Sequence, residues 1–294
     1  MIIEAGQVAV VTGAAQGLGY ALAAGLIDRD VSVVLADTAT ERLHSTTEAL
    51  TVRGGRVLPV STDVSDPAAV HTLASRTLEH FARVDVVINN AGIASGGGRP
   101  LWQTDSQDWQ RVLAVNLLGV VHGIQAFVPH LVRTGAGHVV NIASVAGLAA
   151  MPFTGAYCAS KHAVVAISDT LRRELEAMGL PIGVTVACPG LLRTPMTENL
   201  FTLAQADDDV LAKHLPAHLS IEQLRASLDR MTADPMEPKV AAEHILAAIE
   251  TDRLYALTHN GDFAEAARHR AEDILAALDD RHRSDNHLGT ASDQ

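Results

Sequence analysis

Short runs rich in valine and isoleucine recur along this 294-residue chain and alternate with stretches long enough for helices. Each run is apolar throughout rather than at every second position, so it suits a strand that is buried on both faces, as in a parallel sheet. Regular alternation of strand and helix predicts an α/β fold with a Rossmann-like, doubly wound parallel sheet. The predicted strands are 8–11, 31–35, 57–60, 84–88, 138–142 and 182–186, and the predicted helices are 17–29, 41–52, 68–82, 109–133 and 157–178.

The pattern loosens after Pro189. Residues 190–238 carry three successive aspartates, four prolines and scattered methionines and leucines. Such a long excursion after a strand of a parallel sheet predicts a lid of short helices rather than another strand–helix unit. The elements predicted beyond the lid are a helix over 240–250, a strand over 254–257 and a helix over 263–278.

Length and charge indicate a folded chain with small ligands. With 48% hydrophobic residues the chain can bury a sizeable core. The pattern favours a single domain over 1–280 and a disordered tail over 281–294. The formal net charge of -12 provides neither phosphate neutralisation nor a basic patch. We therefore expect no nucleic-acid partner and no membrane partner.

The cellular compartment is predicted from cysteines and from the start of the chain. The two cysteines, Cys158 and Cys188, belong to no paired framework. No secretory signal pattern is visible at the start, and the apolar stretch 139–153 is interrupted by Asn141 and Ser144. A soluble protein in the reducing cytoplasm is the expectation.

Two other chemistries find no support in the sequence. Fourteen histidines are present, but none lies in H-E-x-x-H or in a Cys/His cluster, and the pair His214 and His218 brackets Pro216. We therefore predict no metal site. Ser144 lacks the flanking glycines of the G-x-S-x-G turn, which excludes that form of serine hydrolase.

A glycine-rich turn, TGAAQGLG over 12–19, lies between the first predicted strand and the first predicted helix. Glycines let the backbone approach a pyrophosphate, and the helix that follows directs its N-terminal dipole at the anion. This context predicts a dinucleotide site rather than an ordinary tight turn. The candidate cofactor-binding residues here are Gly13, Gln16, Gly17, Leu18 and Gly19.

Asp37 closes the second predicted strand, about twenty residues beyond the glycines. A carboxylate there accepts hydrogen bonds from an adenosine ribose. The alternative is an aspartate that caps the next helix. No Arg or Lys stands at Gln16 or Thr38 to pair with a 2'-phosphate, so NAD is favoured over NADP.

Tyr157 and Lys161 are four residues apart, which is one helical turn, so a helix places both on one face. An ammonium beside a phenol favours the phenolate and lowers its pKa from about 10. The pair therefore suits proton transfer. The alternative is a solvated helix face, on which such spacing also recurs.

Together these residues resemble the short type of the short-chain dehydrogenase/reductase superfamily, over roughly residues 6 to 260. Agreement of several independent motifs is more specific than any one. The matching residues are Thr12, Gly13, Gly17 and Gly19; the pair Asp63 and Val64; Asn90, Ala91 and Gly92; Asn116; Ser144; Tyr157 and Lys161; and Pro189, Gly190 and Thr194.

The resemblance implies a role for each match. Tyr157 would move the hydroxyl proton and Ser144 would hydrogen-bond the same substrate oxygen. Lys161 would lower the pKa of the tyrosine and bind the nicotinamide ribose, and Asn116 would hold a water that links Lys161 to solvent. Asp63 and Val64 would contact adenine, and the segment 189–194 would hold the nicotinamide amide. As alternatives, Ser144 is a turn serine, Asn116 a buried amide, and Asn90 and Thr194 are structural.

The expected substrate is a bulky hydrophobic secondary alcohol or ketone rather than a sugar or a charged acid, because the side chains predicted around the pocket are mostly apolar. Core packing is the alternative for part of them. The candidate substrate contacts are Ser144, Val145, Met151, Tyr157, Leu191 and Met196.

The reaction predicted is NAD-dependent interconversion of alcohol and ketone, in which the cofactor carries the hydride. The rival hypothesis is a catalytically silent dinucleotide-binding sensor. By resemblance, the chain forms a homodimer or homotetramer, with the helices 109–133 and 157–178 at one interface.

Overall fold

The computed structural model describes residues 1–94, 99–213, 220–259 and 262–289. Contacts divide the chain into two compact units, Met1–Thr258 and His259–Gln294. The first unit contains the sheet and everything that surrounds it.

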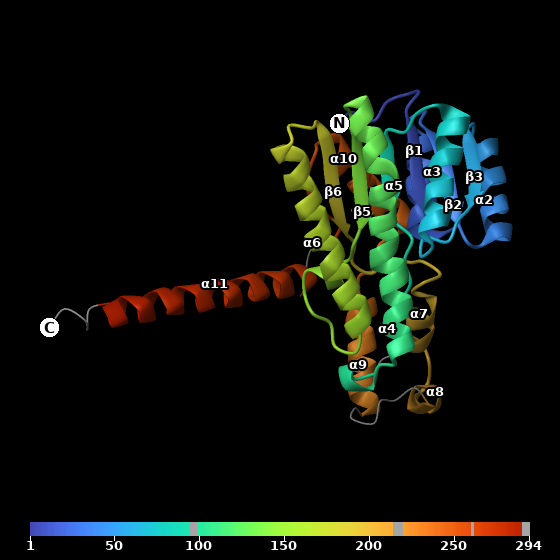
Figure 1. Cartoon of the computed structure of the whole chain (residues 1–294). Coiled ribbons are helices and arrows are strands. Elements are labelled where there is room, and N and C mark those ends of the chain that lie inside the picture. The colour runs from blue at the N-terminus through green and yellow to red at the C-terminus, as the bar shows by residue number, and fades with distance from the viewer. Residues whose placement is uncertain (95–98, 214–219, 260–261, 290–294) are drawn as a thin grey trace. The chain divides into compact units, whose positions relative to one another are not determined.

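Seven parallel strands form one sheet in the order β3-β2-β1-β4-β5-β6-β7 (Figure 1). This is the doubly wound topology that the sequence predicted, so the fold prediction is confirmed. The order reverses between β1 and β4, and ligands of such sheets bind beyond the carboxyl ends of the strands near that point. The strands are β1 (Val8–Thr12), β2 (Ser32–Asp37), β3 (Val57–Ser61), β4 (Val86–Asn89), β5 (Gly137–Ile142), β6 (Ile182–Cys188) and β7 (Tyr255–Leu257).

Helices cover both faces of the sheet because alternate residues of each strand point to opposite sides. Ala9 and Val11 face the core beneath one helix layer, whereas Val8 and Val10 face the other. The first layer contains α1 (Gly17–Ile27), α2 (Thr40–Val52) and α10 (Pro238–Glu250). The second contains α3 (Pro67–Phe81), α5 (Gly119–Thr134) and α6 (Gly155–Ala177).

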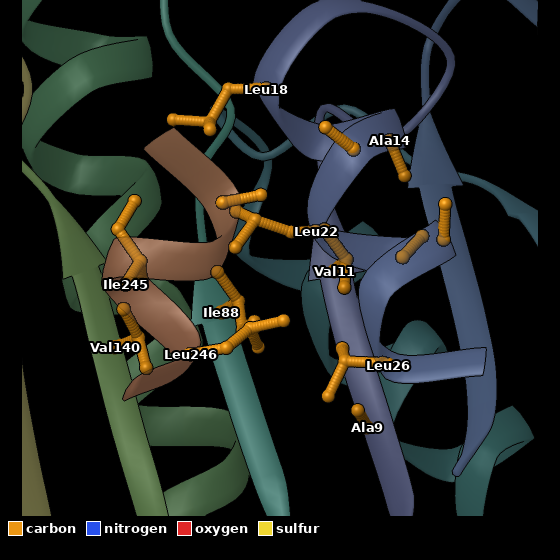
Figure 2. Close-up of a cluster of buried hydrophobic side chains, with 14 of the residues drawn as sticks. Ala9, Val11, Ala14, Leu18, Leu22, Leu26, Ile88, Val140, Ile245 and Leu246 are labelled. Carbon is orange, nitrogen blue, oxygen red and sulfur yellow. The ribbon is translucent and has the colours of Figure 1, made fainter. Parts of the chain in front are cut away.

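The packing of α1 against α10 shows how the first layer is held. Both helices are rich in Ala, with Leu in α1 and Ile in α10, so they approach closely over the centre of the sheet. Figure 2 shows this cluster, with Leu18, Leu22 and Leu26 of α1 and Ile245 and Leu246 of α10 beside Val11, Ile88 and Val140 of the strands.

The predicted helix 109–133 differs from the structure. It begins earlier, as α4 (Ser106–Leu113), because the Asp105 carboxylate caps it by accepting the Gln107 N–H at 2.7 Å. A π-helical turn over Ala114–Leu118 then leads into α5. Among the described residues, Ser106–Thr134 is one helix whose length and apolar composition match a membrane span. A sheet-covering helix passes the same test, and Phe127 and Leu131 are fully buried.

The excursion after β6 consists of short helices, as predicted: α7 (Glu198–Ala204), α8 (Asp208–Lys213) and α9 (Ile221–Thr232). They lie together beyond one end of the sheet (Figure 1). The two ends of the excursion are joined by backbone hydrogen bonds, from Met236 N–H to Leu191 O and from Arg193 N–H to Met236 O, both 3.0 Å. The excursion is therefore a loop closed at its base.

The second unit contains α11 (Asp262–Gly289). The sequence predicted a helix over 263–278, and the structure continues it to Gly289. The first compact unit ends at Thr258, and the single domain over 1–280 stays a prediction. Side chains of Ile274, Leu275 and Leu278 are more than half exposed.

His138 on β5 is a fully buried histidine that the sequence did not single out. Thr185 donates its hydroxyl to Arg253 O at 2.8 Å, so it accepts from His138 Nε2–H at 2.8 Å. The neutral ring then leaves Nδ1 without a hydrogen-bond partner in the described part of the chain, 3.9 Å from Asp252. Burial lowers the pKa of His138 from 6.5 to about 4, although the Asp252 carboxylate opposes this.

We expect His138 to make the protein less stable in acid. The unfolded chain binds a proton at this ring below pH 6.5, whereas the folded protein does not until about pH 4. Unfolding free energy therefore falls between these pH values, by up to roughly 3 kcal/mol. Urea unfolding at pH 7.5 and 5 of wild type, His138→Asn and the exposed-site control His71→Asn measures this. Parallel losses in all three proteins would contradict it.

Candidate active site

A cavity of about 660 Å³ opens at the carboxyl ends of the central strands. The glycine-rich turn, the residue that closes β2 and the tyrosine and lysine of α6 all face it. Motifs that are far apart in the sequence thus share one space. The predicted residues that line it are Gly13, Gln16, Gly17, Leu18, Gly19, Asp37, Asp63, Val64, Asn90, Ala91, Gly92, Ser144, Tyr157, Lys161, Pro189, Gly190, Thr194 and Met196.

Four predicted residues do not line this cavity. Asn116 lies behind its wall, and Val145 is buried at the start of a 3-10 turn (Val145–Gly147). Met151 donates its N–H to Cys158 Sγ at 3.3 Å, beside the N-terminus of α6, and Leu191 accepts the bond that closes the base of the lid. Substrate contact by the last three stays a prediction. These residues were assigned from their place next to a motif in the chain, which does not reveal the direction of a side chain.

The glycine-rich turn leaves no room for side chains. A Cβ on Gly19 would lie 2.2 Å from Gly13 O, and one on Gly13 would lie 2.8 Å from Ala91 Cα. Asn90 Nδ2 donates to Thr12 O at 2.7 Å and to Gly13 O at 3.1 Å. The Asn90 side chain therefore has a structural role, and because it also lines the cavity, its contact with the cofactor stays a prediction. The turn itself is the close-approach cradle that a pyrophosphate requires.

Asp37 joins the glycine-rich turn to the start of α2. Its carboxylate accepts the Ala15 N–H at 3.0 Å and the Ala39 N–H at 2.9 Å. Next to it, Arg42 of α2 hydrogen-bonds Gln16 Oε1. A cation therefore does stand near the predicted ribose site, although none occupies position 16 or 38. The sequence did not indicate this cation, because Arg42 lies on the next helix and not at a position adjacent to Gln16 or Asp37.

The wall at the end of β3 is fixed by Asp63 and Val64. Asp63 Oδ1 accepts the Ser65 N–H at 2.9 Å and its hydroxyl at 2.7 Å. His122 of α5 bonds Val64 O at 2.8 Å, and Gly119 leaves space for the Val64 side chain. Asp63, Val64 and Ser65 all line the cavity, so this wall is polar on both sides of the Val64 side chain.

Tyr157 and Lys161 occupy the first two turns of α6. Lys161 is buried, donates from Nζ to Ile142 O at 2.8 Å and lies 5.6 Å from the centroid of the Tyr157 ring. Burial lowers the pKa of Lys161 to about 8. Burial also raises the pKa of the Tyr157 phenol, which its hydrogen bond with Ser144 opposes. The net direction for the Tyr157 phenol is therefore a raised pKa, because desolvation outweighs the hydrogen bond with Ser144.

Ser144 closes β5 beside the cofactor turn that follows β6. Its hydroxyl accepts the Ala146 N–H at 3.2 Å and donates to Pro189 O at 3.4 Å. These bonds are those of a turn serine, and Ser144 also faces the cavity with Tyr157, so its contact with substrate stays a prediction. Thr194 lies across the cavity, 3.2 Å from where a Cβ on Gly17 would stand.

Asn116 lies in the π-helical turn and is fully buried. Its side chain accepts from Ile93 N at 2.8 Å and donates to Ile93 O at 3.0 Å and to Ser160 Oγ at 3.2 Å. A Cβ on Gly92 would lie 3.4 Å from Asn116 Oδ1 and 3.5 Å from Lys161 Nζ. Asn116 is therefore a buried amide set directly behind Gly92 and close to Lys161, and its catalytic role stays a prediction.

The cavity also has lining residues that the sequence did not reveal. Most lie within one or two positions of a predicted motif, so their place in the chain was the available signal. Arg111 and Val115 belong to α4 and its π-helical turn, and only the helical spacing between them links them to one face. The additional lining residues are Thr38, Ala39, Thr62, Ser65, Ile93, Arg111, Val115, Ile142, Ala143, Leu192, Pro195 and Thr197.

Within the described ranges, no group of three or more His, Cys, Asp or Glu side chains is placed to hold a metal ion. His214 and His218 lie outside the described residues.

The parallel sheet and its cavity define a dinucleotide-binding protein, since a glycine cradle, a helix N-terminus and an acidic residue at the end of β2 meet at one site. The family model of short chain dehydrogenases matches residues 7–204. This chain belongs to the short-chain dehydrogenase/reductase superfamily, as its motifs predicted. It is thus an oxidoreductase-family protein built to bind a nicotinamide dinucleotide.

Individual relatives agree with this placement. The chain is 42% identical to the 1-deoxy-11-beta-hydroxypentalenate dehydrogenase of Streptomyces avermitilis over 193 residues, which are 65% of this chain and 71% of the relative. A short-chain dehydrogenase/reductase of Burkholderia phymatum, solved with NAD, superposes with a TM-score of 0.80 at 36% identity, covering 94% and 97% of the two chains. Levodione reductase gives a TM-score of 0.75 at 28% identity, covering 89% and 99%.

Proposed function

We propose that this protein is an NAD-dependent oxidoreductase that interconverts a secondary alcohol and a ketone. The observation that carries the proposal is that Ser144, Tyr157 and Lys161 face the same cavity as the glycine-rich turn. A hydroxyl pair and a buried amine beside a dinucleotide cradle are the groups that alcohol–ketone redox chemistry needs.

The chain's own residues handle the proton. When bound, the cofactor supplies or accepts the hydride. Tyr157 is protonated in the resting protein because burial raises its pKa, so the phenol donates to a ketone oxygen. In oxidation the phenolate removes the alcohol proton. Ser144 hydrogen-bonds the same oxygen, and Lys161, when charged, stabilises the phenolate as it forms.

NAD is the proposed cofactor. Asp37 is a fixed negative charge at the ribose end of the cavity, and it disfavours a 2'-phosphate. The Arg42 guanidinium beside Gln16 has the opposite effect, because it attracts a 2'-phosphate. The preference between NAD and NADP therefore depends on the balance of the two charges. We propose that Asp37 prevails, because its position is fixed by two backbone N–H groups whereas the Arg42 contact is exposed.

A bulky hydrophobic alcohol is the proposed substrate class. Leu192, Pro195 and Met196 bring the base of the lid to the cavity and are apolar. The relative from Streptomyces avermitilis is named for a hydroxylated compound, which supports an alcohol as substrate.

One assay separates the enzyme from the silent sensor. Purified protein is titrated with NADH by fluorescence and then assayed with NAD and with NADP against a panel of hydrophobic secondary alcohols and polyols. We expect turnover with NAD and the hydrophobic alcohols. Tight NADH binding without turnover on any alcohol would favour the sensor, and a preference for NADP or for polyols would overturn those parts of the proposal.

We also propose a cytoplasmic homodimer or homotetramer. A groove of about 540 Å³ runs between α5 and α6, the two helices that resemblance places at an interface. Its apolar lining suits a second copy of the same two helices, which would bury it. The groove is lined by Ile124, Gln125, Val128, Pro129, Val132, Leu171, Glu174, Leu175, Ala177 and Met178.

A charge in this groove is expected to separate the subunits. Val132 is 36% exposed at the groove, whereas Val52 is 90% exposed on α2, away from it. Val132→Asp would place an unpaired carboxylate in the interface and reduce the mass in solution to that of the 31.0 kDa chain. Light scattering after size exclusion compares it with Val52→Asp, which should keep the wild-type mass. A monomeric wild type would contradict the assembly.

A further inference from the structure

Arg111 of α4 lines the cavity, although the mechanism does not use it. It stands one helical turn before Val115, which also lines the cavity, and five residues before Asn116. Asn116 holds Ile93 through both its backbone N–H and its carbonyl, and Ile93 lines the cavity too. Arg111, Ile93 and Val115 therefore form one wall, which Asn116 fixes from behind.

The cavity has few charges. Among the described residues, its charged lining side chains are Asp37, Asp63, Arg111 and Lys161. Lys161 is buried at the reaction site and donates to Ile142 O. The glycine-rich turn, TGAAQGLG, contributes no basic side chain. Among the described lining side chains Arg111 is thus the cation outside the buried reaction site, while Arg42 reaches only Gln16 at the ribose end.

Asp108 holds the guanidinium in place. Asp108 Oδ1 accepts from Arg111 Nη2 at 2.7 Å, and its own side chain is 13% exposed whereas that of Arg111 is 54% exposed. The carboxylate lies in the first turn of α4, where the helix dipole favours a negative charge. A mostly buried anion that holds one edge of a guanidinium restrains its rotamers, so less entropy is lost when a ligand binds.

We infer that Arg111 binds an anionic group of the cavity's ligand, either the pyrophosphate of the dinucleotide or a carboxylate on an otherwise apolar alcohol. A guanidinium matches the geometry of both anions. The inference deepens the proposed function and rests on it. It also revises the expectation that charged acids are excluded, because that expectation counted only the apolar side chains around the lid.

The test compares Arg111→Met and Arg111→Lys with a matched control. Arg173 of α6 is also an exposed helical arginine, paired with Asp169 at 3.0 Å, and it does not line the cavity. Arg173→Met therefore removes the same kind of ion pair elsewhere. NADH affinity is measured by fluorescence titration at low and high salt. Calorimetry on the NADH-saturated protein then measures binding of a hydroxylated terpenoid carboxylic acid and of its methyl ester.

If the pyrophosphate is the anion, the Kd for NADH rises by roughly tenfold in Arg111→Met and its salt dependence weakens. If the carboxylate is the anion, NADH affinity is unchanged, and Arg111→Met loses roughly tenfold in affinity for the acid but not for the ester. Arg111→Lys recovers part of either loss, because it restores the charge without the planar fork. Arg173→Met matches wild type in both assays.

Affinities for NADH and for the acid that stay within twofold of wild type in Arg111→Met would overturn the inference. Failure of the proposed function is a different result, since it would leave wild-type protein unable to bind NADH or to turn over any alcohol. Loss of affinity in Arg173→Met to the same extent as in Arg111→Met would also overturn it, because the effect would then not belong to the cavity.

Discussion

A Tyr157→Phe variant is expected to lose about three orders of magnitude in kcat while still binding NADH. The change removes one hydroxyl, which is the group proposed to move the proton, and general acid–base catalysis contributes roughly 10²–10⁴-fold. The ring stays, and so does the bond from Lys161 to Ile142 O. Cofactor affinity should therefore change by no more than a few-fold.

The control for this result is Tyr255→Phe on β7. Tyr255 is 43% exposed and does not line the cavity, so loss of its hydroxyl should leave kcat unchanged. Stopped-flow measurement of a single turnover separates the chemical step from cofactor release. A wild-type single-turnover rate in Tyr157→Phe would show that the tyrosine does not transfer the proton. The main support for an enzyme rather than a silent sensor would then be lost.

Lys161→Met is expected to abolish activity and yet to stabilise the protein without cofactor. Met is nearly isosteric with Lys and brings no charge. The pKa of Lys161 is about 8 in the folded protein, against 10.5 in the unfolded chain. Below pH 8 both states are charged, so the folded protein bears the full cost of burying the ammonium, roughly 3 kcal/mol.

The variant also loses the hydrogen bond to Ile142 O, which lowers its unfolding free energy by about 1 kcal/mol and offsets part of the stabilisation. The variant should therefore unfold at higher urea concentration at pH 7. The difference should disappear as pH rises from 8 to 10.5, because the wild-type lysine then sheds its proton in the folded state. At pH 7 activity should fall by about a thousandfold, since the phenolate loses its neighbouring charge.

Lys239→Met, at the start of α10 and away from the cavity, should show neither effect. A Lys161→Met protein that is less stable than wild type at pH 7 would show that the lysine serves the fold. The expected result, greater stability with lost turnover, would show that the fold bears the cost of a charge kept for chemistry.

Sequence patterns predicted those features that depend on local order. The strands were readable because residues such as Val33 and Val34 are buried on both faces, which demands an unbroken apolar run. The cofactor turn was readable because only glycine fits at Gly13 and Gly19. The gathering of Asp37, Ser144 and Tyr157 at one edge follows from parallel topology, which brings the carboxyl ends of all strands together.

Features that depend on contacts between distant segments could not be predicted from the sequence. Arg42 reaches Gln16 from another helix, and Asn116 turns behind Gly92 because of a π-helical turn that the sequence does not announce. The direction of the Tyr157 pKa depends on how deeply the phenol is buried, which spacing from Lys161 cannot reveal. Met151 was assigned to the pocket from its position alone; it does not line the described cavity, and its contact with substrate stays a prediction.

The backbone bonds between Leu191, Arg193 and Met236 give the lid a property of its own. They close the excursion at its base, so the chain between them can change length at an entropic cost of only about 0.6 kcal/mol per doubling. Such a change in length alters neither the sheet nor the cofactor turn. Exchange of this segment would therefore produce a different lid on the same fold.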